Sequence, residues 1–211
     1  MQVRGRVDYG ANDVRAALPG EIQMSQLQYV ANSTVGDSTL TAASLLAGVI
    51  NRTGPVGAYA DTLPTVNQLV AACPQLSVGD SFTFLFRNTV AQANTITAGT
   101  GWTLGSNTSI AASLVREFLV TMTAVKPTTV VSATTTNASA ILTNLSDDAV
   151  KALTPGMLVT GTNIPASTTL IAVNANSRTA TMSAAATGTG NNIAVTANPT
   201  ATLEGVRSST L

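Results

Sequence analysis

The sequence predicts an all-β protein: an antiparallel, jelly-roll-like β-sandwich with one short helix, a second small β-domain inserted near the C-terminus, and an extended N-terminal arm. Three observations favour this class. The chain of 211 residues is 45% hydrophobic but only 4% aromatic and 9% charged, and its abundant Thr, Ala, Val, Gly and Asn are typical of short strands and turns. Apolar and polar side chains alternate in its middle, and the composition changes after Val125.

The stretch 78–125 has the strongest strand pattern. Residues 82–87 alternate, so that three phenylalanines share one face while Thr, Leu and Arg share the other, as in a half-buried strand. Gly and Asn in 98–101 and 104–107 permit tight reversals. We therefore expect a meander that ends in a long strand from Leu114 to Val125.

The segments before this stretch predict shorter elements. Residues 22–29 alternate enough for a strand or part of an arm, residues 39–41 for a short strand, and the apolar run 45–50 for a central strand.

Residues 61–73 give the clearest helix pattern. Apolar side chains recur there at helical spacing, Thr62 is a candidate N-cap, and Pro64 suits the first turn. Cys73 lies on the apolar stripe of this helix, which favours a buried structural thiol over a nucleophile. The helix is expected to close one end of the sandwich.

Residues 127–198 read as a separate small β-domain, because they are rich in Thr and Ala and nearly free of charge. A short helix is expected over 146–153, with Ser146 as its N-cap. Because 201–206 resembles the strands of the first domain, we expect it to pair with 114–125. The sandwich would then comprise 26–126 completed by 199–211, with 127–198 inserted at a hairpin loop and projecting outward. The alternative is two consecutive domains with a free C-terminal tail.

Residues 1–25 are charged and poor in large apolar side chains, so in isolation they could not bury enough surface to stay ordered. We expect them to form an extended arm across another subunit, with Arg4, Arg6, Asp8 and Arg15 as candidate contacts. The alternative is a frayed terminus.

Charge and hydropathy exclude several classes of function. Ten basic and ten acidic residues balance, and the basic ones form no cluster, which argues against direct nucleic-acid binding. No apolar run approaches the length of about 18 residues that spans a bilayer. The first residues lack the apolar core of a signal peptide. A soluble chain, made in the host cytoplasm and without membrane contact, is expected.

The chain contains no histidine, which removes histidine-dependent triads and the commonest metal ligand. Two facing carboxylates could still form a hydrolase, with Asp80 and Glu117 as candidates. Asp147 and Asp148 could bind calcium, but the start of a helix explains them more simply. We therefore expect no enzymatic activity, no cofactor and no metal.

Two glycine-rich segments, 99–105 and 187–192, lack the complete phosphate-binding patterns and are interpreted as hairpin turns. Trp102 lies within the first of them. It is either an exposed contact at a loop tip or a cap on the sandwich.

Several motifs resemble a family of tailed-bacteriophage virion proteins, the capsid decoration (cement) proteins and related head proteins. The similar segments cover about half of the chain and are TLTAASLLAGVINR (39–52), DTLPT (61–65), VGDSFTF with RNT (78–89), AGTGWTLG (98–105) and REFLV (116–120). Residues 156–192 separately resemble a small β-module of phage head, tail and fibre proteins.

The resemblance implies a structural virion protein that binds the outer surface of a phage capsid and stabilises it. Its partners would be the major capsid protein and further copies of itself, as a homotrimer. The family has no active site, so no catalytic residue is carried over. The alternative is a tail, fibre or glycan-binding component for which clustered exposed aromatic residues are expected, and the sequence is poor in them.

Overall fold

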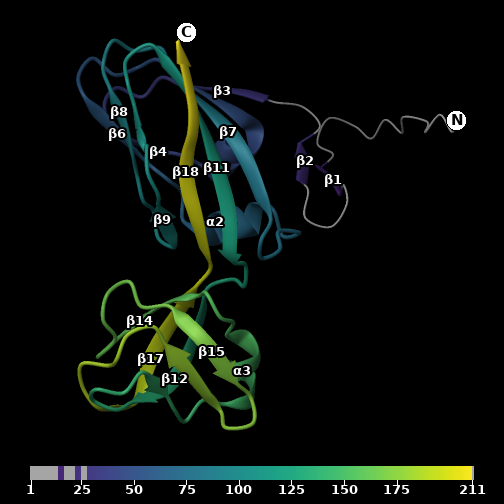
Figure 1. Ribbon diagram of the computed structural model, residues 1–211, viewed down its shortest axis with the longest axis vertical. Coiled ribbons are helices and arrows are strands. Elements are labelled where there is room, and N and C mark those ends of the chain that lie inside the picture. Colours follow the sequence, from purple (N-terminus) through teal and green to yellow (C-terminus); the bar gives the residue numbers. More distant parts are fainter. Residues whose placement is uncertain (1–13, 17–21, 25–27, 211) are drawn as a thin grey trace, which may run out of the picture.

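The structure, a computed structural model, describes residues 14–16, 22–24 and 28–210. Buried hydrophobic side chains form two clusters, one drawn from residues 40–122 with Ala201 and Leu203, the other from residues 124–197. Figure 1 shows the two corresponding bodies, joined end to end. We call them the sandwich and the inserted unit. The all-β class is confirmed, although the described residues contain three short helices where two were expected, one in the sandwich and one in the inserted unit.

The sandwich contains a six-stranded and a four-stranded sheet. The first has the order β3-β5-β7-β11-β18-β9, and the second β10-β8-β6-β4. Their strands, in chain order, are β3 (Gln28–Asn32), β4 (Ser38–Thr39), β5 (Gly48–Arg52), β6 (Tyr59–Thr62), β7 (Ser81–Asn88), β8 (Asn94–Thr97), β9 (Trp102–Leu104), β10 (Ser109–Ile110), β11 (Leu114–Ala124) and β18 (Thr200–Thr210).

The predicted alternation in β7 is confirmed. Phe82, Phe84 and Phe86 are buried, whereas the side chains between them are exposed or half-buried. β7 pairs antiparallel with β11, and this register places Phe84 against Phe118, with their rings stacked 5.3 Å apart. Aromatic pairs of this kind add to the hydrophobic stabilisation of the core.

The predicted meander is wrong. β8 and β10 belong to the second sheet, and β9 pairs parallel with β18 instead of forming a hairpin with β8. The segment 99–105 therefore crosses between sheets. β3, β5 and β7 are also mutually parallel, as are β4, β6 and β8. Alternation identifies a strand but says nothing of its partner's direction, which explains the difference.

The central strand expected over 45–50 is only half correct: residues 48–50 belong to β5, between β3 and β7, but residues 45–47 belong to helix α1 (Ala42–Ala47). Thr41 and Ser44 form a capping box at the start of this helix, the arrangement that satisfies free N–H groups in a first turn. Gly48, with φ of 90°, ends the helix and begins β5.

The predicted helix over 61–73 is shorter than expected. Its first residues form the end of β6, and α2 spans Val66–Ala72 with Thr65, not Thr62, as its N-cap. Thr65 and Gln68 form a second capping box. The helix buries its apolar side against the sandwich core and lies at the end that faces the inserted unit (Figure 1).

The inserted unit packs two three-stranded sheets, β12-β17-β14 and β13-β16-β15. The segment 187–192, like 99–105, was predicted to be a hairpin turn. This prediction is wrong, because β16 and β17 lie in different sheets. Helix α3 (Asp147–Ala152) begins at N-cap Ser146, as predicted. The strands are β12 (Thr129–Thr135), β13 (Ile141–Leu142), β14 (Leu158–Gly161), β15 (Leu170–Asn174), β16 (Thr179–Met182) and β17 (Gly190–Asn198).

The predicted antiparallel pairing of 114–125 with 201–206 is confirmed, and β18 continues to residue 210. The chain thus leaves the sandwich after β11 and re-enters it at β18. The Thr123 hydroxyl donates to the Thr200 hydroxyl, which donates to the Gly156 carbonyl. Asn67 of α2 accepts a hydrogen bond from the Thr128 N–H. These bonds fix the junction of the two bodies.

Two further strands, β1 (Val14–Ala16) and β2 (Ile22–Met24), pair antiparallel with each other. The rest of the expected N-terminal arm lies outside the described residues. In the part of the chain that the structure describes, no helix has the length and apolar character needed to cross a membrane.

Candidate functional site

A buried ion pair joins the two sheets of the sandwich. The Arg52 Nε donates to the Asp61 carboxylate, at 3.0 Å from Oδ2 and 3.2 Å from Oδ1. Both side chains are 0% exposed. Arg52 is the last residue of β5, and Asp61 lies in β6 of the facing sheet. Removing two charges from water is costly, so such a pair persists only when its remaining groups are also satisfied.

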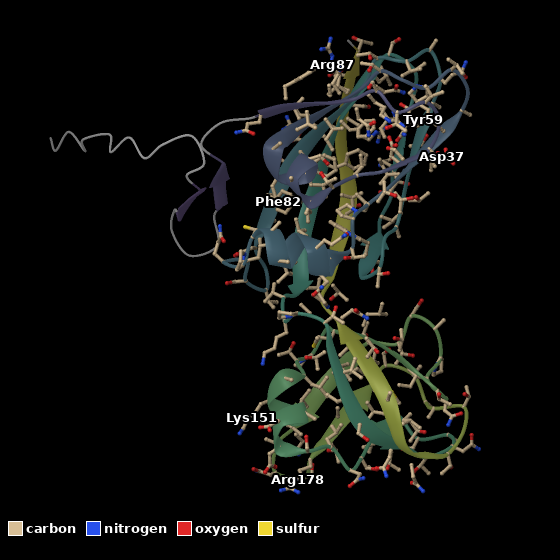
Figure 2. All side chains as sticks on the ribbon, turned by 180° about the vertical axis from the view of Figure 1, so that it is seen from behind. Asp37, Tyr59, Phe82, Arg87, Lys151 and Arg178 are labelled. Carbon is tan, nitrogen blue, oxygen red and sulfur yellow. The ribbon has the colours of Figure 1, made fainter. Side chains whose placement is uncertain are left out.

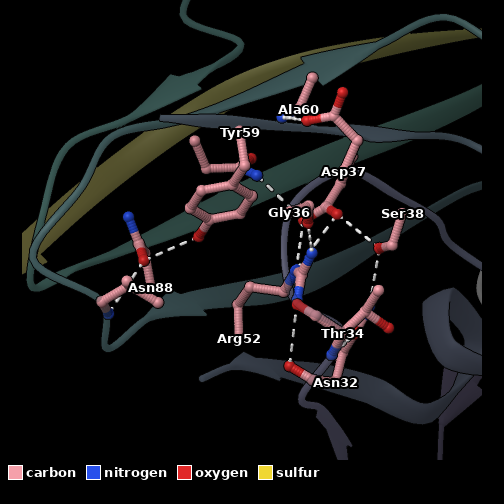
Figure 3. A network of polar contacts seen from close by, with 12 residues as sticks. Asn32, Thr34, Gly36, Asp37, Ser38, Arg52, Tyr59, Ala60 and Asn88 are labelled. Atoms are coloured by element: carbon pink, nitrogen blue, oxygen red, sulfur yellow. Dashed lines mark hydrogen bonds and ion pairs between the residues drawn. The ribbon is translucent and has the colours of Figure 1, made fainter. Parts of the chain in front are cut away.

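The Arg52 guanidinium is satisfied by the backbone that follows β3 (Figure 3). Nη1 donates to the carbonyl oxygens of Thr34, at 2.5 Å, and Asn32, at 3.4 Å. Nη2 donates to the carbonyl oxygen of Gly36. One buried arginine therefore holds the carbonyl group of Asn32, the last residue of β3, and those of Thr34 and Gly36 in the loop that follows.

Asp61 binds two further donors. The Ser38 hydroxyl donates to Oδ1 at 2.5 Å, and the Asn94 amide donates to Oδ2 at 2.9 Å. Ser38 in turn accepts a hydrogen bond from the Asn32 amide. The carboxylate thus links β4, β5, β6 and β8. Because its oxygens are committed to these donors, it is poorly placed to act as a general base.

Tyr59 packs against the ion pair. The guanidinium carbon of Arg52 lies 4.9 Å from the centre of its ring, a cation–π distance, and its hydroxyl donates to the Asn88 side chain at 2.8 Å. Burial, with the Asp61 charge as the second cause, raises the pKa of Tyr59 to about 12. The phenol therefore stays neutral near neutral pH and serves as a hydrogen-bond donor.

The network lies under three loops, residues 33–37, 53–58 and 89–93, which we call the loop end. They share one end of the sheet because they follow β3, β5 and β7, which are parallel and in register at their last residues. Thr89 donates to the Arg52 carbonyl, and Asn88 donates to the Gln92 carbonyl. All three loops are therefore tied to the same network.

The first two loops pack tightly on each other at Gly54. A Cβ atom at this position would lie 2.1 Å from the Ser33 carbonyl oxygen and 2.3 Å from that of Thr34. No side chain fits in this space, so only glycine permits this approach. Asp37 also accepts a hydrogen bond from the Ala60 N–H, which fixes the end of the first loop. The loop end thus has a single, closely packed backbone arrangement.

The candidate carboxylates take separate structural roles. Asp80 accepts a hydrogen bond from the Ser77 N–H at the turn before β7. Glu117 pairs with exposed Arg207 across β11 and β18. Cys73 is buried, and burial, followed by the Asp80 charge, raises the pKa of its thiol. Among the described residues, no group of three potential ligands gathers where a metal could bind.

Trp102 is not an exposed contact, because its side chain is only 8% exposed. It begins β9, packs in the sandwich core, and donates from its indole N–H to the Pro64 carbonyl at 2.5 Å. This matches the alternative in which it caps the sandwich. Arg4, Arg6 and Asp8 lie outside the described residues, and Arg15 is described only by its place in β1.

The ion pair between Arg52 and Asp61 was not predicted from the sequence. Its signal is weak: Arg52 follows Val49, Ile50 and polar Asn51, and Asp61 takes the position in YADT that shares a face with buried Tyr59. Neither residue has a local partner in the sequence. Their pairing depends on two strands from different sheets facing each other, which periodicity does not reveal.

Comparisons of the chain with protein-family models, with curated proteins and with solved structures each find no match.

Proposed function

We propose that the chain is a structural virion protein that binds the outer surface of a phage capsid and stabilises it, as a decoration or cement protein. The observation that carries this proposal is the loop end, an ordered surface built on a buried ion pair at the end of a two-sheet scaffold. A surface of this kind suits binding, because its order is set before a partner arrives. The resemblance of several motifs to phage head proteins suggests the class of partner.

The chemistry of the network supports binding rather than catalysis. Its carboxylate is engaged by three side-chain donors, and its phenol has a raised pKa. A catalytic base needs a free lone pair and a pKa near the working pH. Neither group meets both conditions.

Binding only to an assembled shell would stabilise that shell by mass action, because every bound copy disfavours its disassembly. In this proposal the sandwich forms a homotrimer, the inserted unit projects outward, and residues 1–25 reach the major capsid protein or a neighbouring copy. Many weak contacts repeated over the shell then add up to stable attachment.

The direct test is co-sedimentation of the purified chain with empty heads of the virus that encodes it, assembled without it. We expect saturable binding, and reconstruction of the decorated heads should place the protein outside the shell. A chain without residues 1–20 should stay folded by circular dichroism but bind much more weakly. Absence of binding by the full chain, combined with adsorption to host cells or to a glycan array, would favour a tail or fibre component instead.

A further inference from the structure

The two most exposed large hydrophobic side chains among the described residues both lie at the loop end. Val56 is 85% exposed and Val35 is 72% exposed. They belong to loops 53–58 and 33–37, which touch at Gly54. Single exposed hydrophobic residues are common on protein surfaces, but here the two most exposed ones lie on loops that pack against each other.

The buried network fixes the loops that carry these valines. Arg52 binds carbonyl groups on both sides of Val35, those of Thr34 and Gly36. Val56 follows Gly54 and buried Pro55. Apolar side chains held on an ordered backbone lose little conformational freedom when they bind. Burying an ion pair costs free energy. A partner that binds the two exposed valines would explain why the chain holds their loops in this costly way.

The charge of the loop end defines the chemistry of that partner. Asp37 is the only ionisable residue in its three loops, and its carboxylate is already bound by the Ala60 N–H. The three loops carry no basic side chain, and exposed Arg87, just before the third loop, is a single charge, so the loop end does not suit nucleic acid or an anionic membrane. Two isopropyl groups surrounded by hydroxyl and amide groups fit a shallow, uncharged, apolar depression on a folded protein.

The position of the loop end sets the orientation. Figure 2 places Asp37 and Tyr59 in the sandwich and Arg178 at the far end of the inserted unit. Contact through the loop end would therefore leave the inserted unit pointing away from the partner. This agrees with an outward projection of residues 127–198 from a shell.

We propose that Val35 and Val56 insert together into an apolar depression of the assembled viral shell and anchor the chain with its inserted unit outward. This inference rests on the proposed function and adds to it the contact surface and its chemistry. Arg52 is a positioning residue in this scheme, because it holds the loop and does not touch the partner.

The test uses empty heads of the virus that encodes the chain, assembled without it. The tip variant is Val35→Asp with Val56→Asp, and the matched control is Val130→Asp with Ile171→Asp, at positions 66% and 60% exposed on the inserted unit. Both should keep the circular dichroism and melting temperature of the parent chain. Losing the burial of two valines should weaken binding of the tip variant at least about ten-fold, while the control binds like the parent.

The outcomes separate the two proposals. If the parent chain does not bind heads, the proposed function fails. If the parent binds and the tip variant binds equally well, the function stands and the inference is overturned. Weaker binding by the control alone would reverse the orientation and also overturn it. If the aspartates disturb folding, Val35→Ser with Val56→Ser provides the same comparison without added charge.

Discussion

The sandwich and the inserted unit hold their loops in different ways. In the sandwich, a buried side-chain network reaches across two sheets to bind the carbonyl groups of a loop. In the inserted unit, short connections turn through five non-glycine residues with positive φ, Ala138, Asn144, Asn163, Ser167 and Arg178, whereas the described connections of the sandwich contain two, Asn107 and Ser113. Each such residue costs local strain, and the positive φ is set by that residue itself, although Ala138 and Arg178 also bond to Ala186 and Asp147.

The difference shows which residues determine the conformation of the loops in each body. A loop held by Arg52 depends on residues far apart in the sequence, so that one substitution should affect the whole loop end. A turn held by its own φ value depends on one residue, so that its substitution should remain local. Four predictions test this contrast, from the largest expected effect to the smallest.

Replacing Arg52 with alanine should destabilise the sandwich most. It leaves the Asp61 carboxylate buried without its cationic partner, which typically costs about 3–5 kcal/mol. Urea unfolding followed by the fluorescence of Trp102, the single tryptophan, measures the change. Arg207→Ala is the matched control, because it breaks an exposed pair and should cost at most about 1 kcal/mol. Equal losses in both variants would remove the special role of the buried pair.

High pH should weaken the sandwich through Tyr59. In the unfolded chain a tyrosine ionises near its ordinary pKa of 10.0, whereas folded Tyr59 stays neutral until about pH 12. The stabilising effect of this shift is complete below pH 10 and is lost as the pH rises to about 12, by roughly 2–3 kcal/mol.

Urea unfolding across that range, with and without Tyr59→Phe, checks this dependence. The variant should lose the tyrosine contribution to the pH dependence. Both chains should carry Cys73→Ala, because the thiol also has a raised pKa and would add its own loss. An identical pH dependence in the two chains would contradict the buried, neutral state of Tyr59.

Gly54→Ala should destabilise the loop end, because its Cβ would overlap two backbone oxygens and force the loops apart. Strain of this kind costs about 1–3 kcal/mol. Gly57→Ala, in the same loop, is the control, since its Cβ would meet nothing within 4 Å. It should be neutral or slightly stabilising. Thermal unfolding of the two variants measures the difference, and a stable Gly54→Ala chain would show that the loops are not closely packed.

Ala138→Gly should stabilise the inserted unit slightly, by less than about 1 kcal/mol, because it relieves a positive φ of 60°. The control is Ala175→Gly, at an exposed turn residue outside the positive-φ set. This change should destabilise instead, since glycine adds only freedom to the unfolded chain. Calorimetry of the full chain measures the change in stability of each variant. A change of the same sign in both variants would contradict the view that the residue with positive φ determines the turn.

The sequence predicted features that depend on neighbouring residues. The alternation around Phe84, the cap at Ser146 and the strand character of 201–206 were all correct, because period and capping are local. It failed where two local interpretations compete. AASLLAGVI, residues 42–50, has enough apolar residues for a strand, yet the Thr41–Ser44 capping box makes its first half helical.

The loop end was the least predictable part. Val35 and Val56 are ordinary residues in glycine-containing segments, and only the parallel order of β3 and β5 brings their loops together. Arg52 and Asp61 are nine residues apart, yet they meet through strands of different sheets. The features of the proposed binding surface therefore come from topology rather than from motif.

The paired strands β11 and β18 also have a mechanical consequence. Both connect to the inserted unit at the same end of the sandwich (Figure 1), so a force that pulls this unit outward draws the two strands as one ribbon. That ribbon can leave only by sliding along its two neighbours: β7, to which β11 is bonded from Leu114 to Thr121, and β9, to which β18 is bonded from Ala201 to Leu203. The whole ladder then bears the load in shear, and the core ring of Phe118 must move with it. Tension along the molecule is resisted collectively, whereas sideways peeling would break the same bonds one after another.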